Sequence, residues 1–435
     1  MPDALILAAG RGDRMRDQGL IKPLVPFLGV PLLERAMTVL ARIGVRRIVV
    51  ATGWQAEAVS EAARRYGARL GVEVEPVYAP DWERGNGASA AAAAGRFDRP
   101  FLLVMCDHLF EPEMLAKLAE QTPPARGLVL AVDRNLSHPL VDWDDVTCVR
   151  VEGAAIRAIG KGLPNPDGFD TGAFLLTPEA LARLKEERIP SMTELVRRLA
   201  EEGRAQAWDA SGYFWADLDR PDLLQRAEAL WLAKIAGKAH DGPVSRRLNR
   251  PISVRLSRWF IRHRIRPMQI TWLAFAMSVV AALFVAMPPW WAIAFGGILA
   301  QLASIVDGCD GEVARATYQE SDYGGWVDAV LDRYADALLL GAMCWHALVH
   351  EMAGMSAVAA GLAALSGALI NSYTADKYDG WMRKHQKAYR FRLGRDVRVF
   401  AFFLACLLDA PMALLVLTAA VMHLENLRRL WVVGR

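Results

Sequence analysis

The chain has 435 residues, too many for one ordinary domain, and its composition combines two opposite tendencies. Hydrophobic residues make up 53%, above the usual share for a soluble protein, yet charged residues still make up 23%, which excludes a chain embedded wholly in a membrane. A net charge of +3 excludes the basic excess of a nucleic-acid-binding protein, so we expect no nucleic acid partner. The composition indicates a soluble part joined to a membrane part.

Residues 1–235 alternate short β-type runs with helical stretches. Alternating elements of this kind predict an α/β domain, Rossmann-like, with a mainly parallel sheet covered by helices. Sheets of this kind bind phosphate-bearing ligands at the carboxyl ends of their strands. The expected strands are Ala4–Ala8, Arg47–Ala51, Val72–Val77, Phe101–Met105 and Leu128–Val132, and the expected helices include Pro31–Ile43 and Ala56–Tyr66.

From about residue 267 the chain consists largely of long apolar segments that contain no Lys or Arg. Each is long enough for two spans, so residues 267–435 predict an all-α domain of six transmembrane helices. The segments are Met268–Val306, Tyr334–Asp376 and Val399–Glu425, with breaks expected at Pro288-Pro289, His350–Gly354 and Asp409–Pro411.

Connections rich in Lys and Arg alternate with connections that have none. The positive-inside rule therefore predicts a multi-pass protein of the cell (inner) membrane, with the N-terminal domain and the C-terminus in the cytoplasm. Residues 236–266 are expected to form a linker and a basic amphipathic helix along the membrane face. A charged linker is the alternative.

A glycine-rich turn follows the first expected strand, in the segment Leu7–Met15, and Lys22-Pro23-Leu24 comes soon after. Small residues let a nucleotide approach the backbone, whose N–H groups can cradle phosphates. Two cations, Arg14 and Lys22, can neutralise a triphosphate as charge builds on a leaving pyrophosphate, so we expect both to be catalytic. The small nucleotide-binding candidates are Ala8, Ala9, Gly10 and Gly12.

These motifs make residues 3–230 similar to the sugar-phosphate nucleotidyltransferases. The resemblance implies that Gly85 and Asn86 contact the nucleotide and that Asp107 and Asp217 bind a metal ion. Mg²⁺ suits this role because it takes few carboxylates together with phosphate oxygens. On its own Asp107 is equally typical of a turn. Asp219 is an alternative to Asp217.

The same resemblance places two residues at the second substrate. Lys161 would meet the phosphate of the acceptor, although a lysine in a polar loop is usually only solvated. Asp170 lies in a segment that would touch the acceptor. We expect His108 to be a neighbour of Asp107 rather than a ligand.

Four aspartates flank apolar spans in the C-terminal half. Asp307 and Asp310 are three residues apart, and Asp328 and Asp332 are four apart, so each pair shares a helix face. Acids in this position are unfavourable unless compensated, and divalent cations are the compensation we expect.

The spacing DxxDGxxAR followed by GxxxDxxxD resembles the CDP-alcohol phosphotransferase family. The resemblance implies Mg²⁺ (or Mn²⁺) at this site as at the first, held by Asp307, Asp310 and Asp328. Asp332 would be the general base and could also touch the metal ion. The resemblance also implies that Gly311 leaves room for the cytidine nucleotide and that Arg315 pairs with the phosphates of this nucleotide.

Three cations follow at the membrane entrance: Lys377, Arg395 and Arg398. They are candidates for binding an acceptor that carries its own phosphate, because arginine suits forked recognition of phosphate. Positive-inside anchors that bind nothing specific are the alternative.

The fusion of these two domains resembles the bifunctional inositol-1-phosphate cytidylyltransferase and di-myo-inositol phosphate phosphate synthase family. That resemblance implies synthesis of CDP-inositol from CTP and inositol-1-phosphate. Transfer of the phosphoinositol group to a second inositol-1-phosphate would then release CMP and give a compatible solute. It also implies a homodimer formed through the membrane domain. A phospholipid synthase, with the N-terminal half supplying an NDP-alcohol, and a non-catalytic membrane tether are the alternatives.

Overall fold

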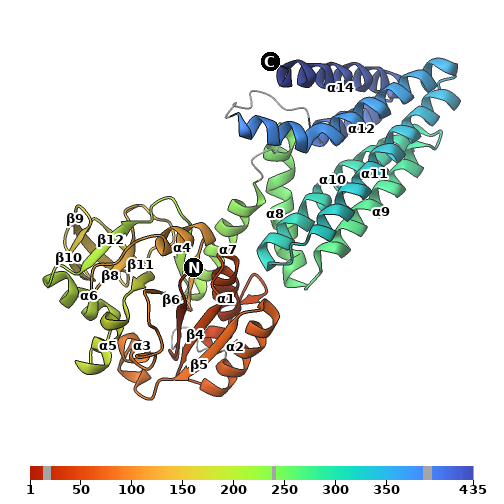
Figure 1. The fold of residues 1–435 in the computed structure, drawn as a ribbon. Helices are drawn as coiled ribbons and strands as arrows, with labels where there is room; N and C mark the ends of the chain where they lie inside the picture. Colours follow the sequence, from red (N-terminus) through yellow and green to blue (C-terminus); the bar gives the residue numbers. More distant parts are fainter. Residues whose placement is uncertain (13–20, 238–241, 386–393, 435) are drawn as a thin grey trace. The chain divides into compact units, whose positions relative to one another are not determined.

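The computed structural model describes residues 1–12, 21–237, 242–385 and 394–434 (Figure 1). The chain forms two compact units, Met1–Trp231 and Leu232–Arg435. Their boundary falls inside helix α7 (Pro221–Ala236).

The first unit is built on a nine-stranded sheet with the order β5-β4-β1-β6-β11-β8-β12-β10-β9. The five predicted strands are confirmed, with ends that shift by one residue at most. The strands are β1 (Ala4–Ala8), β4 (Arg47–Thr52), β5 (Glu73–Tyr78), β6 (Phe101–Met105), β8 (Leu128–Asp133), β9 (Thr147–Glu152), β10 (Ala155–Lys161), β11 (Gly168–Leu176) and β12 (Ala205–Asp209).

The prediction of a mainly parallel sheet is wrong for its second half. Strands β5, β4, β1 and β6 are parallel, as is the β8–β12 pair, but β11 runs antiparallel to both β6 and β8. Strands β9 and β10 form a hairpin across Gly153-Ala154, and Gly153 has a φ of +62°. A two-residue connection can only join antiparallel strands.

Helices pack against this sheet and fix the loops at its edge. Helices α1 (Leu32–Arg42) and α2 (Ala56–Leu70) pack on the β1–β4–β5 part, and α6 (Met192–Glu201) packs on β10 and β12. Leu5, Leu103 and Phe174 lie in the core and are fully buried. The remaining elements are β2 (Pro26–Phe27), β3 (Val30–Pro31), β7 (His108–Phe110), β13 (Trp215–Asp217), α3 (Asn86–Ala91), α4 (Pro112–Ala119), α5 (Pro178–Glu186) and the short helices η2 (Lys22–Leu24) and η3 (Trp82–Arg84).

The second unit is helical, and its breaks fall where the sequence predicts them. Pro289 caps the start of α10, His350 the end of α11, and Asp409 lies between α13 and α14. The helices are η4 (Ser245–Asn249), α8 (Arg250–Arg262), α9 (Pro267–Val285), α10 (Trp290–Thr317), α11 (Asp322–Val349), α12 (Gly354–Lys384), α13 (Arg395–Leu407) and α14 (Pro411–Val433).

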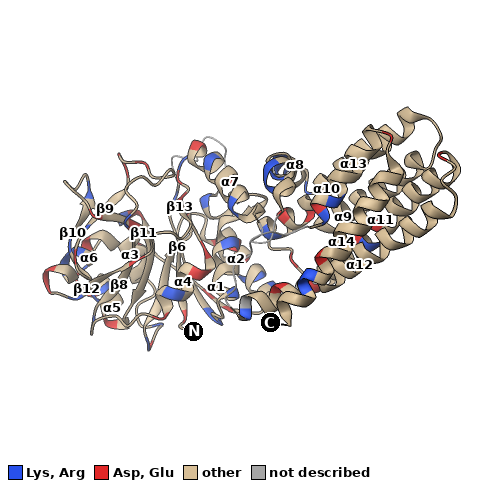
Figure 2. Cartoon of the chain, turned by 90° about the horizontal axis from the view of Figure 1, so that it is seen from above, with Lys and Arg blue, Asp and Glu red and all other residues tan. Residues whose placement is uncertain are grey.

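Among the described residues, three helices are long and apolar enough to cross a membrane: Pro267–Val285, Trp290–Thr317 and Gly354–Met382. With 13 residues, α13 extends roughly 20 Å, less than the roughly 30 Å of a bilayer's hydrocarbon core. The helices α11 and α14 are long enough but contain several charged residues. Figure 2 shows long uncharged stretches in these helices, with charged residues gathered toward the end where α8 lies.

The predicted basic amphipathic helix is formed by η4 and α8, and one of its faces packs on α10. The side chain of Glu312 on α10 is fully buried there. Its carboxylate accepts hydrogen bonds from Ser253 Oγ at 2.6 Å and Ser257 Oγ at 2.7 Å. Arg250 Nη1 donates a third at 2.6 Å. A buried carboxylate therefore joins α8 to the helix that carries Asp307 and Asp310.

We predict that Glu312→Gln destabilises the second unit, because breaking a buried charge pair costs about 3 kcal/mol. The melting temperature of the purified full-length protein in detergent measures the effect. Glu351→Gln is the matched control, because Glu351 is exposed at the end of α11. Equal melting temperatures for the two variants would contradict the role of Glu312.

Candidate active sites

The glycine-rich turn after β1 lines a cavity of about 740 Å³ at the carboxyl ends of β1 and β6. Ala9, Gly10 and Gly12 line it, whereas Ala8 is the buried last residue of β1. Gly12 has a φ of +66°, and a Cβ at this position would lie 2.6 Å from the Lys22 Cβ. A glycine is therefore required for Lys22 to approach the turn. Arg14 lies outside the described residues.

Two acids and a histidine face one another in this cavity. Asp107 follows β6 and is paired with Lys22, while Asp217 ends β13. His108 lies directly opposite Asp217 in the β7–β13 pair. Its Nε2 is 3.5 Å from Asp217 Oδ2 and 3.9 Å from Asp107 Oδ1, and its Nδ1 lies 2.7 Å from the Thr171 carbonyl oxygen. The imidazole of His108 thus lies between the two acids, and His108 is a neighbour of Asp107 as expected.

The pKa values show how strongly these charges interact. Burial disfavours the charged form of His108, but the charges of Asp217 and Asp107, together with the hydrogen bonds to Asp217 and the Thr171 backbone, raise the pKa of His108 to about 10. Burial also opposes ionisation of Asp217, yet the charges of His108 and Lys22 and the hydrogen bonds of this carboxylate together lower the pKa of Asp217 to about 2. Burial and the charge of Asp217 raise the pKa of Asp219 to about 6. Asp219 lines the same cavity as Asp217.

The other predicted residues of the first unit reach the same cavity. Gly85 has a φ of +131°, and a Cβ there would lie 2.5 Å from the Pro190 carbonyl oxygen. Asn86 begins α3, and its Oδ1 accepts a hydrogen bond from Met192 N at 2.9 Å, which joins α3 to the start of α6.

Lys161 and Asp170 lie on different strands that border the cavity. Lys161 donates a hydrogen bond to Asp145 Oδ1 at 2.6 Å. Asp170 accepts one from Gly172 N at 2.8 Å, and burial raises the pKa of Asp170 to about 6. Sequence patterns gave no sign of Arg197, which also lines the cavity, because an arginine on an amphipathic surface helix has no distinguishing spacing.

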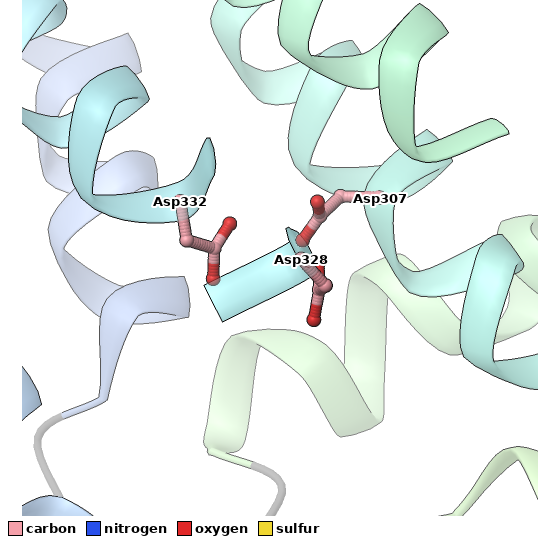
Figure 3. A group of neighbouring side chains, drawn as sticks. All are labelled: Asp307, Asp328 and Asp332. Carbon is pink, nitrogen blue, oxygen red and sulfur yellow. The ribbon is translucent and has the colours of Figure 1, made fainter. Parts of the chain in front are cut away.

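In the second unit the side chains of Asp307, Asp328 and Asp332 converge (Figure 3). Each offers a carboxylate oxygen within 4.8 Å of the others. Asp307 comes from α10 and the other two from α11. Asp310 is not a member of this group, and its Oδ2 accepts a hydrogen bond from Thr271 Oγ1 of α9 at 2.6 Å.

The guanidinium group of Arg395 lies among these carboxylates. Its Nη1 is 3.0 Å from Asp307 Oδ2 and 2.6 Å from Asp332 Oδ1. Its Nε is 3.1 Å from Asp336 Oδ1, and Arg398 Nη2 is 2.9 Å from Asp336 Oδ2. A cation is evidently stable within the group, and oxygen ligands of this kind fit Mg²⁺ or Mn²⁺. Asp336 was not predicted, although it extends the spacing of Asp328 and Asp332 by one more turn.

The remaining predicted residues have other contacts. Lys377 is exposed and donates a hydrogen bond to the Tyr373 hydroxyl at 2.9 Å. A Cβ at Gly311 would lie 3.1 Å from Arg315 Nη1, so this glycine leaves room for the arginine. Arg315 Nε donates to the Ile235 carbonyl oxygen at 2.8 Å.

We predict that Arg395→Gln makes the second unit depend on divalent cations. Without the guanidinium, the carboxylates of Asp307 and Asp332 repel one another unless a metal ion neutralises them. The melting temperature in EDTA should fall below that of the wild type, and the rise on adding Mn²⁺ should be larger. Arg262→Gln, at an exposed position of α8, is the control. An unchanged response to Mn²⁺ would contradict a cation position among the aspartates.

Comparisons with known proteins agree with this division of the chain. The MobA-like NTP transferase domain family matches residues 4–159, and the CDP-alcohol phosphatidyltransferase family matches residues 264–425. A protein of Rubrobacter xylanophilus named bifunctional IPC transferase and DIPP synthase is 39% identical, over 99% of this chain and 96% of its own length. A protein of the same name from Aquifex aeolicus is 34% identical, over 99% of this chain and 98% of its own length.

The solved structure of the inositol-1-phosphate CTP transferase from T. maritima is 25% identical, with a TM-score of 0.45, and covers 52% of this chain and 96% of its own. The curated relatives extend over almost the whole chain and include both units. The chain therefore belongs to the family of bifunctional IPC transferases and DIPP synthases.

Proposed function

We propose that the chain catalyses two consecutive transfers. The first makes CDP-inositol and pyrophosphate from CTP and inositol-1-phosphate. The second transfers the phosphoinositol group to a hydroxyl of another inositol-1-phosphate and releases CMP, giving a soluble di-myo-inositol phosphate that still carries the phosphate of the acceptor. The observation that carries the proposal is that relatives named for both activities are 39% and 34% identical to this chain over almost its full length. Two separate groups of acids and cations, one in each unit, support it.

In the first reaction a phosphate oxygen of inositol-1-phosphate attacks the α-phosphorus of CTP. Asp107 and Asp217 would hold a Mg²⁺ or Mn²⁺ ion, which supplies positive charge to the phosphate oxygens when bound. Lys22 would neutralise the leaving pyrophosphate, and so would Arg14. The nucleotide would be faced by Ala9, Gly10, Gly12, Gly85 and Asn86. Ala8, at the buried end of β1, would support the turn.

The acceptor side of the first cavity would be formed by Lys161 and Asp170. Lys161 is the one positively charged residue of the two and would pair with the phosphate of inositol-1-phosphate. Its ion pair with Asp145 would then have to give way to the substrate. Such positioning accounts for much of the catalysis expected in a phosphoryl or nucleotidyl transfer.

In the second reaction a hydroxyl group of the acceptor attacks the β-phosphorus of CDP-inositol. Asp332 would take the hydroxyl proton as general base. Asp307, Asp310 and Asp328 would hold the divalent cation, with Asp310 turning from Thr271 to do so. Gly311 and Arg315 would face the cytidine nucleotide.

The phosphate of the acceptor needs cations that are fixed beside the aspartates. Arg395 and Arg398 satisfy this requirement, because both are held on one face of α13 by Asp336. Lys377 would meet the acceptor only at its approach to the site, since its side chain is exposed and contacts Tyr373.

We also propose that the second unit spans the membrane six times, through α9 to α14. The apolar character of α9, α10 and α12 and the alternation of basic and non-basic connections support this topology. Both termini and the first unit would be cytoplasmic, where CTP is available, and residues 236–266 would link the units along the membrane face. The homodimer implied by the family resemblance stays a prediction.

The proposal is tested with purified full-length protein, CTP, Mg²⁺ and inositol-1-phosphate, followed by phosphorus NMR. We expect pyrophosphate, CMP and a water-soluble phosphodiester to form without added lipid. A strict requirement for lipid would instead support a phospholipid synthase. Absence of any turnover would favour a non-catalytic tether.

We predict that one substitution in each unit separates the two reactions. Asp107→Asn should slow formation of CDP-inositol by roughly 10²–10³-fold, because charge stabilisation of that size is typical. It should leave transfer from supplied CDP-inositol intact. Asp332→Asn should accumulate CDP-inositol with little CMP, because the general base is lost.

Exposed aspartates provide matched controls for this experiment, with Asp98→Asn in the first unit and Asp322→Asn in the second. Both should run the two reactions at wild-type rates. Loss of both reactions in either Asp107→Asn or Asp332→Asn would contradict two independent sites.

A further inference from the structure

Asp336 is a buried carboxylate to which neither proposed reaction assigns a chemical step. It follows Asp332 by one helical turn on α11, so the two side chains lie on the same face. Its side chain is only 5% exposed. A charge buried to this extent needs fixed partners, and Asp336 has two arginines of α13 as partners.

Each carboxylate oxygen of Asp336 pairs with a different guanidinium group. Oδ1 lies 3.1 Å from Arg395 Nε, and Oδ2 lies 2.9 Å from Arg398 Nη2. The arginines are three residues apart and share a helix face. Asp336 therefore fixes the orientation of both side chains at once.

The contacts of Arg395 are divided between its nitrogen atoms. Nη1 contacts Asp307 and Asp332, whereas Nε contacts Asp336. A divalent cation bound by Asp307 would compete for the contact between that carboxylate and Nη1 and would repel the guanidinium group. The contact between Nε and Asp336 lies outside that competition. Asp336 can thus keep Arg395 beside the site after the cation has bound.

Arg398 is held by the same carboxylate and by α12. Its Nη2 also donates to Ser372 Oγ at 3.1 Å, and its Nη1 donates to Asn371 Oδ1 at 3.4 Å. The side chain is 9% exposed. Ser372 and Asn371 are neutral, so of these partners Asp336 is the one that compensates the charge of Arg398.

Resting on the proposed function, we propose that Asp336 is a positioning residue of the second reaction. It holds Arg395 and Arg398 so that both guanidinium groups meet the phosphate of the acceptor while Asp307 binds the cation and Asp332 acts as the general base. Asp336 itself touches neither the substrate nor the cation. Its loss should therefore weaken use of the acceptor and spare the binding of CDP-inositol and metal.

The test supplies CDP-inositol to the full-length protein and varies inositol-1-phosphate. In Asp336→Asn the KM for inositol-1-phosphate should rise roughly tenfold or more, as expected when a charge-assisted hydrogen bond is lost. The KM for CDP-inositol should stay within about twofold of the wild type, below the effect of one such bond. Asp336→Glu restores the carboxylate and should recover most of the acceptor KM.

A second readout separates positioning from general damage to the site. Mn²⁺ binding is measured by EPR in proteins that also carry Asp107→Asn, which removes the proposed cation site of the first unit. The affinity for Mn²⁺ should be the same whether or not the protein also carries Asp336→Asn. Asp322→Asn is the matched control for an aspartate of α11, and it should change neither the KM nor Mn²⁺ binding.

Three results would overturn the role of Asp336. One is an unchanged acceptor KM in folded Asp336→Asn, and another is an equal loss of CDP-inositol and Mn²⁺ binding. If Asp336→Asn does not fold, Arg398→Lys takes its place, because lysine keeps the positive charge but cannot form the two-pronged hydrogen bonds of a guanidinium group. A normal acceptor KM in Arg398→Lys is the third result. A wild-type protein that transfers nothing to inositol-1-phosphate would overturn the proposed function, a result distinct from these three.

Discussion

Mutual repulsion among the carboxylates of Asp307, Asp328 and Asp332 is the constraint on which the second unit depends. Carboxylates this close to one another and flanked by apolar helices are unfavourable unless a cation lies among them. In this structure Arg395 provides that cation from α13, and a divalent metal ion would provide it during turnover. The guanidinium group of Arg395 on α13 thus contacts acids of both α10 and α11.

The first unit also holds acidic side chains close together, but on an α/β framework. There the parallel strands β1 and β6 deliver a glycine turn and Asp107 to one edge of the sheet, and the small antiparallel pair β7–β13 brings Asp217 beside them. Lys22 and His108 compensate the acids. In both units acids are held close by rigid elements and neutralised by protein cations, an arrangement suited to reactions in which positioning and charge stabilisation do most of the catalysis.

The sequence predicted elements whose signal is local. Strands such as Phe101–Met105 are fully apolar, and helix breaks coincide with prolines and glycines, so both were placed to within a residue or two. Strands β9, β10 and β12 were missed because polar residues interrupt them and many of their residues are only partly buried. Asp310 was grouped with the other aspartates by spacing and by the family resemblance, whereas its contact with Thr271 on α9 depends on helix packing. Asp336 and Glu312 were missed for the same reason, since their partners lie 55 to 62 residues away.

Anomalous scattering from crystals of the full-length protein grown with Mn²⁺ and a CDP-alcohol measures the cation position most directly. We predict a manganese peak bound by Asp307, Asp310 and Asp328 and close to Asp332, with Arg395 moved away from Asp307 but still bound to Asp336. A peak in the first unit accompanied by none among these aspartates, with Arg395 in its present contacts, would contradict the account.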